Sequence, residues 1–285
     1  MMTPLILYFT IFHYGPMWGI LLAFKDYYPL KGFHGSAWVG FKHFDQLLSG
    51  LYFWPVFFNT LTISTLKLLF GFPAPIILAL LLNEVHHEKF KRTIQTITYM
   101  PHFISWVVLA GLVIEFLSPS RGPVNYLLQS LGFKPIFFVA EERWFRPVLV
   151  ASSIWREIGW QSIIYLAAIS QINPELYDVA EIDGAGKIKK ILYVTLPSIF
   201  PTIVIMFIFA VGNLMNDDFE QIINLLNPKV MSVGDVITTY TFREGLQKLN
   251  YSYATALGFF TNLLSFLFVV TANTVARRLT GESIF

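Results

Sequence analysis

The sequence predicts an all-α membrane protein, a single domain over residues 1–285 with six transmembrane helices. Hydrophobic residues make up 55% of the chain and charged residues only 13%, whereas a soluble domain carries about 25% charged residues. Six windows are long and apolar enough to cross a bilayer, which takes about 20 residues. They lie at roughly 4–24, 57–82, 94–117, 146–169, 198–215 and 253–275. Every window holds some polar residues, so we expect the helices to pack as a bundle.

The first window starts almost at the beginning of the sequence and runs from Pro4 to Phe24. It has no positively charged start and no small-residue cleavage site, as a signal peptide would have. We interpret it as a retained first helix whose cytoplasmic lead-in is missing or very short. In the second window, Pro73 and Pro75 predict a kink. Lys67 is expected to snorkel or to pair with an internal acid, and no function is assigned to it.

The fourth window contains Arg156 and Glu157, flanked by Trp155 and Trp160. A charge inside the bilayer costs about 2.5–3.5 kcal/mol on insertion scales, so these side chains should face the bundle interior or a wet cavity. Two interpretations stay open: a lining that binds a hydroxyl-rich solute, with indoles stacking on it, or an ion pair that fixes helix packing. Neighbours in a helix do not face each other, so separate partners are expected for the two charges.

The fifth window ends in a polar sequence whose residues have helical spacing. If the helix continues, one face carries a polar stripe that would suit a solute path. The stripe comprises Asn213, Asp217, Glu220 and Gln221. The alternative is a helix that simply emerges into water. The outer segments, about 25–56, 118–145 and 216–252, are rich in interfacial aromatic residues. They include a candidate interfacial helix at Phe41 to Leu48 and two weaker path candidates, Tyr240 and Arg243.

The segment between the fourth and fifth windows, residues 173–197, predicts a short helix too polar to span a membrane. Asn173 suits the N-cap and Pro174 the first helical position. Gly184 and Gly186 allow the positive φ that ends a helix. A second helix is expected from Ile188 until Pro197 breaks it. Such a projection is connected to two spans, so a force applied to it would move both of them.

The spacing in this segment resembles the EAA loop of ABC-importer permeases. The family pattern is Glu-Ala-Ala, three residues, Gly, nine residues, Ile, one residue, Leu-Pro. Every interval matches here, with Asp replacing Glu and Val replacing the first Ala. The matching positions are Asp178, Val179, Ala180, Gly184, Val194, Leu196 and Pro197, and Asp183 fits a common extension of the motif.

This resemblance implies a type I ABC importer permease with a cytoplasmic coupling helix. Two separate ATP-binding subunits would bind ATP and Mg, this chain would bind no cofactor, and its segment 173–197 would receive their motion. A second, non-identical permease and an extracellular solute-binding protein would complete the importer. The chain would lie in a bacterial plasma membrane with both termini cytoplasmic. Lys and Arg counts in the loops favour neither orientation clearly, so the orientation depends on the motif.

Further strings extend the resemblance to MalF/MalG-like carbohydrate permeases, in the branch for oligo- and polysaccharide uptake. They are 12–17, 23–27, 101–106, 155–160, 219–223 and 251–256. The resemblance implies sugar import.

Other functions lack support in the sequence. The chain has no Cys, and its net charge of +2 is too small to indicate a nucleic-acid partner. Hydrolase and zinc-protease motifs are missing, and Gly184–Lys187 lacks the residues of a phosphate-binding loop. An ion-gradient-driven secondary transporter remains the alternative, but such proteins usually carry internal repeats. A membrane-embedded enzyme would need a nucleophile or metal ligands in the spans.

Overall fold

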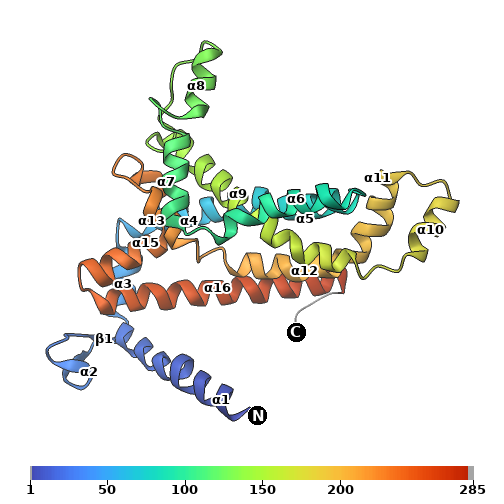
Figure 1. Ribbon diagram of the computed structural model, residues 1–285. Helices are drawn as coiled ribbons and strands as arrows, with labels where there is room; N and C mark the ends of the chain where they lie inside the picture. Colours follow the sequence, from blue (N-terminus) through green and yellow to red (C-terminus); the bar gives the residue numbers. More distant parts are fainter. Residues whose placement is uncertain (1, 282–285) are drawn as a thin grey trace.

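The computed structural model describes residues 2–281 as an elongated helical bundle (Figure 1). Helix α5 packs on α9, and α12 packs on α16. The bundle consists of α4 (Phe53–Leu66) with α5 (Pro73–Asn83), α6 (Glu88–Tyr99), α9 (Glu142–Ile169), α12 (Leu196–Gly212) and α16 (Tyr251–Thr280). Between α4 and α5 the helix widens into one π turn, η3 (Lys67–Gly71).

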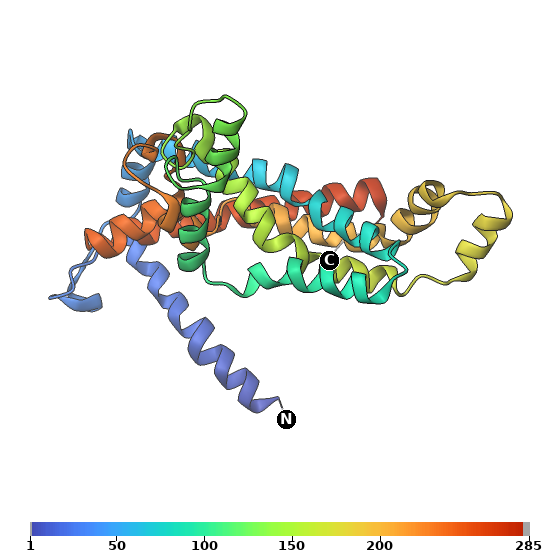
Figure 2. The same cartoon turned by 45° about the horizontal axis from the view of Figure 1, so that its top comes forward.

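Within the described residues, four continuous helices are long and apolar enough to cross a membrane. They coincide with the first, second, fifth and sixth predicted windows and cover Thr3–Phe24, Phe53–Asn83, Lys187–Gly212 and Tyr251–Leu279. Helix α9 covers the fourth window, including the charged pair Arg156 and Glu157, but it is not among the helices that are apolar enough by this criterion. The first of these helices, made of α1 (Thr3–Phe9), η1 (Thr10–Tyr14) and η2 (Gly15–Phe24), stands apart from the bundle and contacts α16 through η2 (Figure 2).

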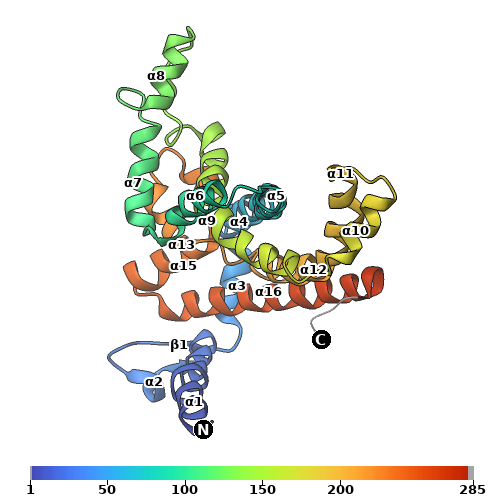
Figure 3. The same ribbon diagram turned by 45° about the vertical axis from the view of Figure 1, so that its right-hand side comes forward.

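The third predicted span, 94–117, needs correction because it is not one straight helix. Helix α6 continues into η4 (Met100–Phe103), and α7 (Trp106–Phe116) then departs at 109°. The break follows Pro101, which has no N–H to donate, and Ile104 and Ser105 are extended, with ψ of 133° and 148°. As a result, α7 and the following α8 (Pro123–Ser130) project sideways from the bundle (Figure 3).

The expected break at Pro197 is also wrong. The helix runs without interruption through α11 (Lys187–Lys190), η5 (Ile191–Thr195) and α12. Its π turn pairs the N–H of Leu196 with the carbonyl of Ile191, one residue further back than in an α-helix. This wider turn accommodates a proline that would otherwise clash with the preceding turn. The fifth span therefore begins at Lys187, well before the predicted residue 198.

Short elements close the end of the bundle opposite α11. Strands β1 (Lys25–Asp26) and β2 (Ala37–Trp38) pair antiparallel around α2 (Gly32–Gly35). Helix α3 (Lys42–Ser49) confirms the helix predicted at 41–48. The remaining elements there are α13 (Phe219–Leu225), α14 (Met231–Gly234), α15 (Ile237–Phe242) and η6 (Arg243–Gln247). They share apolar cores with α4, α7, α9 and α16.

A test of this packing comes from Gly159, where α9 crosses α6. A methyl group at this position would lie 2.2 Å from the carbonyl oxygen of Thr98. Because that oxygen belongs to the backbone, we expect Gly159→Ala to destabilise the folded protein by about 1–3 kcal/mol, as overpacked cores do. Thermal unfolding in detergent measures this loss. Gly111→Ala in α7 is the matched control, since its methyl group meets nothing within 4 Å. Equal melting of the two variants would contradict the close crossing.

Candidate functional site

The segment predicted to couple forms a projection at one end of the bundle (Figures 1 and 3). Helix α10 (Glu175–Ile182) begins after Pro174. The side-chain oxygen of Asn173 accepts a hydrogen bond from the N–H of Glu175 at 3.1 Å. Such a bond satisfies one of the free N–H groups at a helix start, as predicted for Asn173, but the helix begins one residue later than predicted and Pro174 is its N-cap.

Gly184 ends α10 by a left-handed turn, with φ of +76°. The N–H of Ala185 bonds to the carbonyl of Ala180, and that of Gly184 to the carbonyl of Glu181, both at 2.9 Å. This pair of bonds is a Schellman motif, which favours glycine at the left-handed position. Gly186 has φ of −70°, so the positive φ predicted there was wrong.

Two side-chain contacts brace α10 against the helix that follows. The hydroxyl groups of Tyr177 and Thr195 lie 2.9 Å apart, and Lys190 Nζ lies 2.6 Å from Glu181 Oε2. The hydrogen bond from Lys190 lowers the pKa of Glu181. Because Thr195 is buried at the start of the fifth span, its contact with Tyr177 links α10 directly to that span.

The outer face of α10 is apolar and unpaired within the described chain. Leu176 is 49% exposed, Val179 57% and Ile182 85%. Asp178, Val179 and Ala180 lie on this helix, and Asp183 and Gly184 form its end. Leu196 and Pro197, the other predicted coupling residues, lie in the first turn of α12, where the segment joins the bundle. Apolar side chains gathered on a surface projection are typical of a protein-docking site.

A polar cavity of about 250 Å³ lies inside the bundle between η3, α9 and the end of α12. Three of the predicted path residues, Glu157, Asn213 and Asp217, line it together. Its other polar lining residues are Ser64, Lys67, Ser153, Gln161 and Asn216. Hydroxyl, amide and carboxylate groups from three spans therefore line one cavity.

Arg156 and Glu157 do contact each other, contrary to our expectation from helix geometry. Arg156 Nη1 donates to Glu157 Oε1 at 3.0 Å. Each also has a second partner: Glu157 Oε2 lies 3.1 Å from His102 Nδ1, and Arg156 lies 3.7 Å from Asp218. The long arginine side chain can fold back to its neighbour, which a rule based on Cβ directions does not cover.

Aromatic rings enclose this charged group. The imidazole of His102 stacks on Trp160 with ring centres 4.5 Å apart and planes 4° from parallel. The guanidinium of Arg156 lies 4.9 Å from the ring centre of Trp106, and the indole N–H of Trp106 donates to Asp218. Because His102 belongs to η4, the break in the third span is tied to the fourth span here.

The continuous polar stripe predicted at the end of the fifth span does not form. Helix α12 stops at Gly212, and α13 starts at Phe219. Asp217 accepts the N–H of Asp218, and the side chain of Asp218 caps α13. Such side-chain bonds compete with helix continuation. Asp217 and Gln221 are consequently buried, while Glu220 is exposed and outside the cavity lining.

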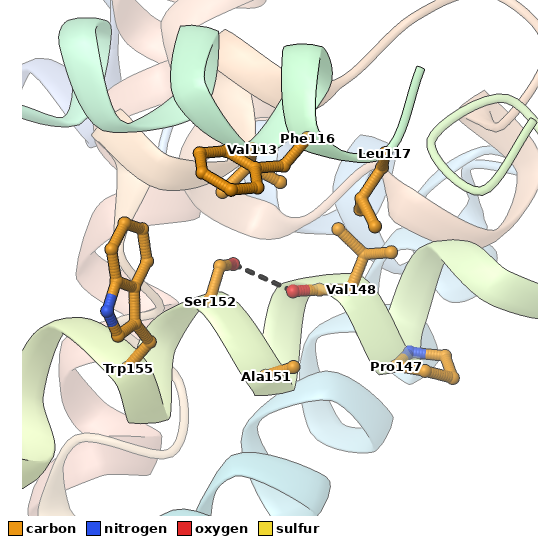
Figure 4. Close-up of a pocket in the computed structure, with 8 residues that line it drawn as sticks. All are labelled: Val113, Phe116, Leu117, Pro147, Val148, Ala151, Ser152 and Trp155. Carbon is orange, nitrogen blue, oxygen red and sulfur yellow. Dashed lines mark hydrogen bonds between the residues drawn. The ribbon is translucent and has the colours of Figure 1, made fainter. Parts of the chain in front are cut away.

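Trp155 lies on a different face of α9 from Glu157. It borders an apolar cavity of about 530 Å³ between α7 and α9, together with Val113, Phe116 and Leu117 (Figure 4). Ser152 is the polar lining side chain, and its hydroxyl donates to the carbonyl of Val148. Trp155 thus does not share the polar cavity.

Tyr240 and Arg243 form a separate cluster among the short elements at the end of the bundle opposite α11 (Figure 1). Arg243 Nη2 lies 2.5 Å from Asp235 Oδ2, and the hydroxyl of Tyr52 donates to the same carboxylate at 2.8 Å. Tyr240 is 3.1 Å from the hydroxyl of Tyr253, and burial raises its pKa. These contacts join α4, α15 and α16, so both residues have structural partners away from the cavity.

Among the residues of the charged networks near the cavity, Lys67, His102, Trp106 and Asp218 were not predicted as site residues. The signal for Lys67 was present, since it is a lone cation in an apolar window and such residues usually have a specific partner. Its amine bonds to Asp217 and Gln221, both at 2.5 Å. The contacts of His102, Trp106 and Asp218 depend on how three spans pack, and the sequence carries no sign of that.

The model of the family described as "Binding-protein-dependent transport system inner membrane component" matches residues 71–281. The chain belongs to this family. The matched region of the permease contains α10 and the polar cavity except Ser64, Lys67 and Leu68. This membership excludes the ion-gradient-driven alternative and leaves the type I permease fold.

Relatives align with the whole permease. This chain is 42% identical over 285 residues to "Protein LplB" of Bacillus subtilis (strain 168), and the alignment covers 100% of this chain and 90% of LplB. It is also 42% identical to the polygalacturonan/rhamnogalacturonan transport system permease protein YteP of the same organism, covering 100% and 89%. A chain in the crystal structure of a bacterial alginate ABC transporter, in complex with an alginate pentasaccharide-bound periplasmic protein, matches with a TM-score of 0.91. That chain is 44% identical, with 100% of this chain and 95% of that chain covered.

Proposed function

We propose that this permease is the membrane-spanning subunit through which an ATP-driven importer moves oligo- or polysaccharides. The observation that carries the proposal is α10: a short helix with an exposed apolar face, capped by Gly184 and braced to the fifth span through Tyr177 and Thr195. Docked in a separate ATPase subunit, α10 would pass the closure of the ATPase dimer to the spans. ATP and Mg would be bound by that subunit.

The saccharide class is supported by two independent observations. Curated relatives are named for polygalacturonan, arabinooligosaccharide and galactooligosaccharide transport, and a matched solved transporter imports the acidic polysaccharide alginate. The polar cavity offers the chemistry that hydroxyl-rich molecules need, because carboxylates accept and amides both donate and accept hydrogen bonds. Glu157, Asn213 and Asp217 are its proposed contacts.

The assembly follows from the same proposal. A second, related permease would complete the path, two ATP-binding subunits would hold the two coupling helices, and an extracellular binding protein would deliver the sugar. With α10 in the cytoplasm, α3, α8 and α15 face outward and both termini are cytoplasmic.

The absence of cysteine from the sequence allows a direct test with single introduced cysteines. Val179→Cys places a thiol on the exposed face of α10, and Tyr126→Cys places one on α8, where the side chain is 74% exposed. We expect a thiol crosslinker to join position 179, and not position 126, to the ATPase subunit. A membrane-impermeant maleimide applied to intact cells should label position 126 alone.

The opposite labelling pattern would show that α10 faces outward and would refute the proposal. Crosslinking of neither position, in a complex that still hydrolyses ATP, would refute the coupling role. Uptake of an oligogalacturonide mixture by vesicles that contain the whole importer, with galacto-oligosaccharides as a neutral comparison, tests the substrate class. Uptake of neither sugar would contradict it.

A further inference from the structure

Lys67 occupies the point where the second span meets the end of the fifth. It begins the π turn η3, and its amine bonds to Asp217 Oδ1 and Gln221 Oε1, both at 2.5 Å. The side chain of Lys67 is 15% exposed and that of Asp217 only 3%. π turns inside α-helices frequently mark functional positions, and an ion pair this well buried fixes its members in one geometry.

The surrounding groups occupy one carboxylate oxygen of Asp217 and leave the other free. Oδ1 accepts bonds from Lys67 and from the N–H of Asp218. Gln221 is held in turn, because its amide donates to the carbonyl of Leu149 at 2.7 Å and to the hydroxyl of Ser152 at 2.8 Å. Oδ2 is buried and has no hydrogen-bond partner among the described residues.

The free oxygen belongs to a residue that lines the polar cavity. A second buried group without a protein partner, the hydroxyl of Ser64, belongs to another residue of that lining. A buried acceptor left without a hydrogen bond destabilises the protein, and more so when it is charged. Both groups therefore favour an occupant of the cavity that carries hydroxyl groups.

We propose that Lys67 is a positioning residue, which holds Asp217 by Oδ1 so that Oδ2 accepts a hydrogen bond from a sugar hydroxyl. The proposal depends on the proposed function and adds a residue that it did not include. A purely structural role is the competing explanation: the ion pair would then only fasten the second span to the segment after the fifth.

Exchanging the two charges separates these explanations. The double variant Lys67→Asp with Asp217→Lys restores an ion pair between the same positions but removes the carboxylate from position 217. The experiment uses the whole importer in vesicles, with its binding protein and an oligogalacturonide mixture as the probe. The measured quantity is the probe concentration that half-saturates stimulated ATP hydrolysis.

We expect Lys67→Met to raise that concentration roughly tenfold, the loss of about one hydrogen bond to a charged group. Lys67→Arg should stay close to the wild type because it keeps the ion pair. The exchanged variant should assemble and yet remain as impaired as Lys67→Met. Asp217→Asn, which keeps the shape of the side chain but places an amide in the site, should be impaired as well.

Wild-type half-saturation in the exchanged variant would show that the pair is only structural and would overturn the inference. If Lys67→Met and the exchanged variant both fail to assemble, Asp217→Asn provides the test. A half-saturating probe concentration equal to that of the wild type in Asp217→Asn would also overturn the inference. Failure of the proposed function looks different, because the wild-type complex itself would then show no stimulation by the probe.

Discussion

Replacing Gly184 by valine is expected to uncouple the importer while leaving the chain inserted in the membrane. The residue has φ of +76°, a conformation that costs an L-residue about 1–2 kcal/mol. The two hydrogen bonds that end α10 depend on this turn. A cost of that size lowers the ratio of chains with the turn formed to chains without it by a factor of roughly 5–30. Since α10 is too short to stay helical without its end, its docking face would be lost.

Two measurements check this expectation: co-purification of the ATPase subunit and sugar-stimulated ATP hydrolysis. Gly186→Val is the matched control, because it adds the same bulk two residues away at φ of −70°, with nothing within 4 Å of the new Cβ. The control should retain coupling. Transport at the wild-type rate in Gly184→Val would show that the backbone turn is dispensable and would count against the coupling role of α10.

Replacing Glu157 by alanine is expected to produce the largest loss among the cavity residues. Its carboxylate contacts His102 and Arg156 and lines the polar cavity. Removing it leaves Arg156, a half-buried cation, with Asp218 as its remaining acidic partner. Hydrogen bonds to charged groups contribute about 1.5–3 kcal/mol each. We therefore expect sugar transport to fall roughly 10- to 100-fold.

Initial rates of oligogalacturonide uptake measure this loss. Glu157→Gln keeps the size and the acceptor oxygen, so it should lose less than Glu157→Ala. Glu220→Ala removes an equal side chain that is exposed and outside the cavity lining, and its effect should be smaller than either. If Glu220→Ala proves more damaging than Glu157→Ala, the solute path lies along α13 and not through the cavity.

Local features of the fold were well predicted because their causes lie within a few residues of sequence. The extended apolar runs identified the positions of the helices, and Asn173 and Gly184 identified the ends of α10. The errors in predicting helix breaks arose where the rule that proline ends a helix was applied to irregular backbone. Pro197 does not break its helix because a π turn precedes it, whereas Pro101 precedes a bend of 109°. The residue type is the same, and the surrounding hydrogen bonds decide the outcome.

The candidate cavity was predicted only in part. Glu157, Asn213 and Asp217 meet in it, but Trp155 borders an apolar cavity. Helical geometry accounts for this separation, since residues two apart in a helix point to widely different directions. Asp217 is buried because α12 ends before it, and not because it continues a helical stripe.

The sequence by itself determined that this is a helical membrane protein with one projecting segment, because apolar run length and cap spacing act locally along the chain. Only the tertiary structure decided which polar groups meet. The amine of Lys67 and the carboxylate of Asp217 are 150 positions apart in the chain, and no periodicity relates them. Their contact follows from the packing of the second span against the end of the fifth, where a charge buried in an apolar bundle is stable beside an opposite one.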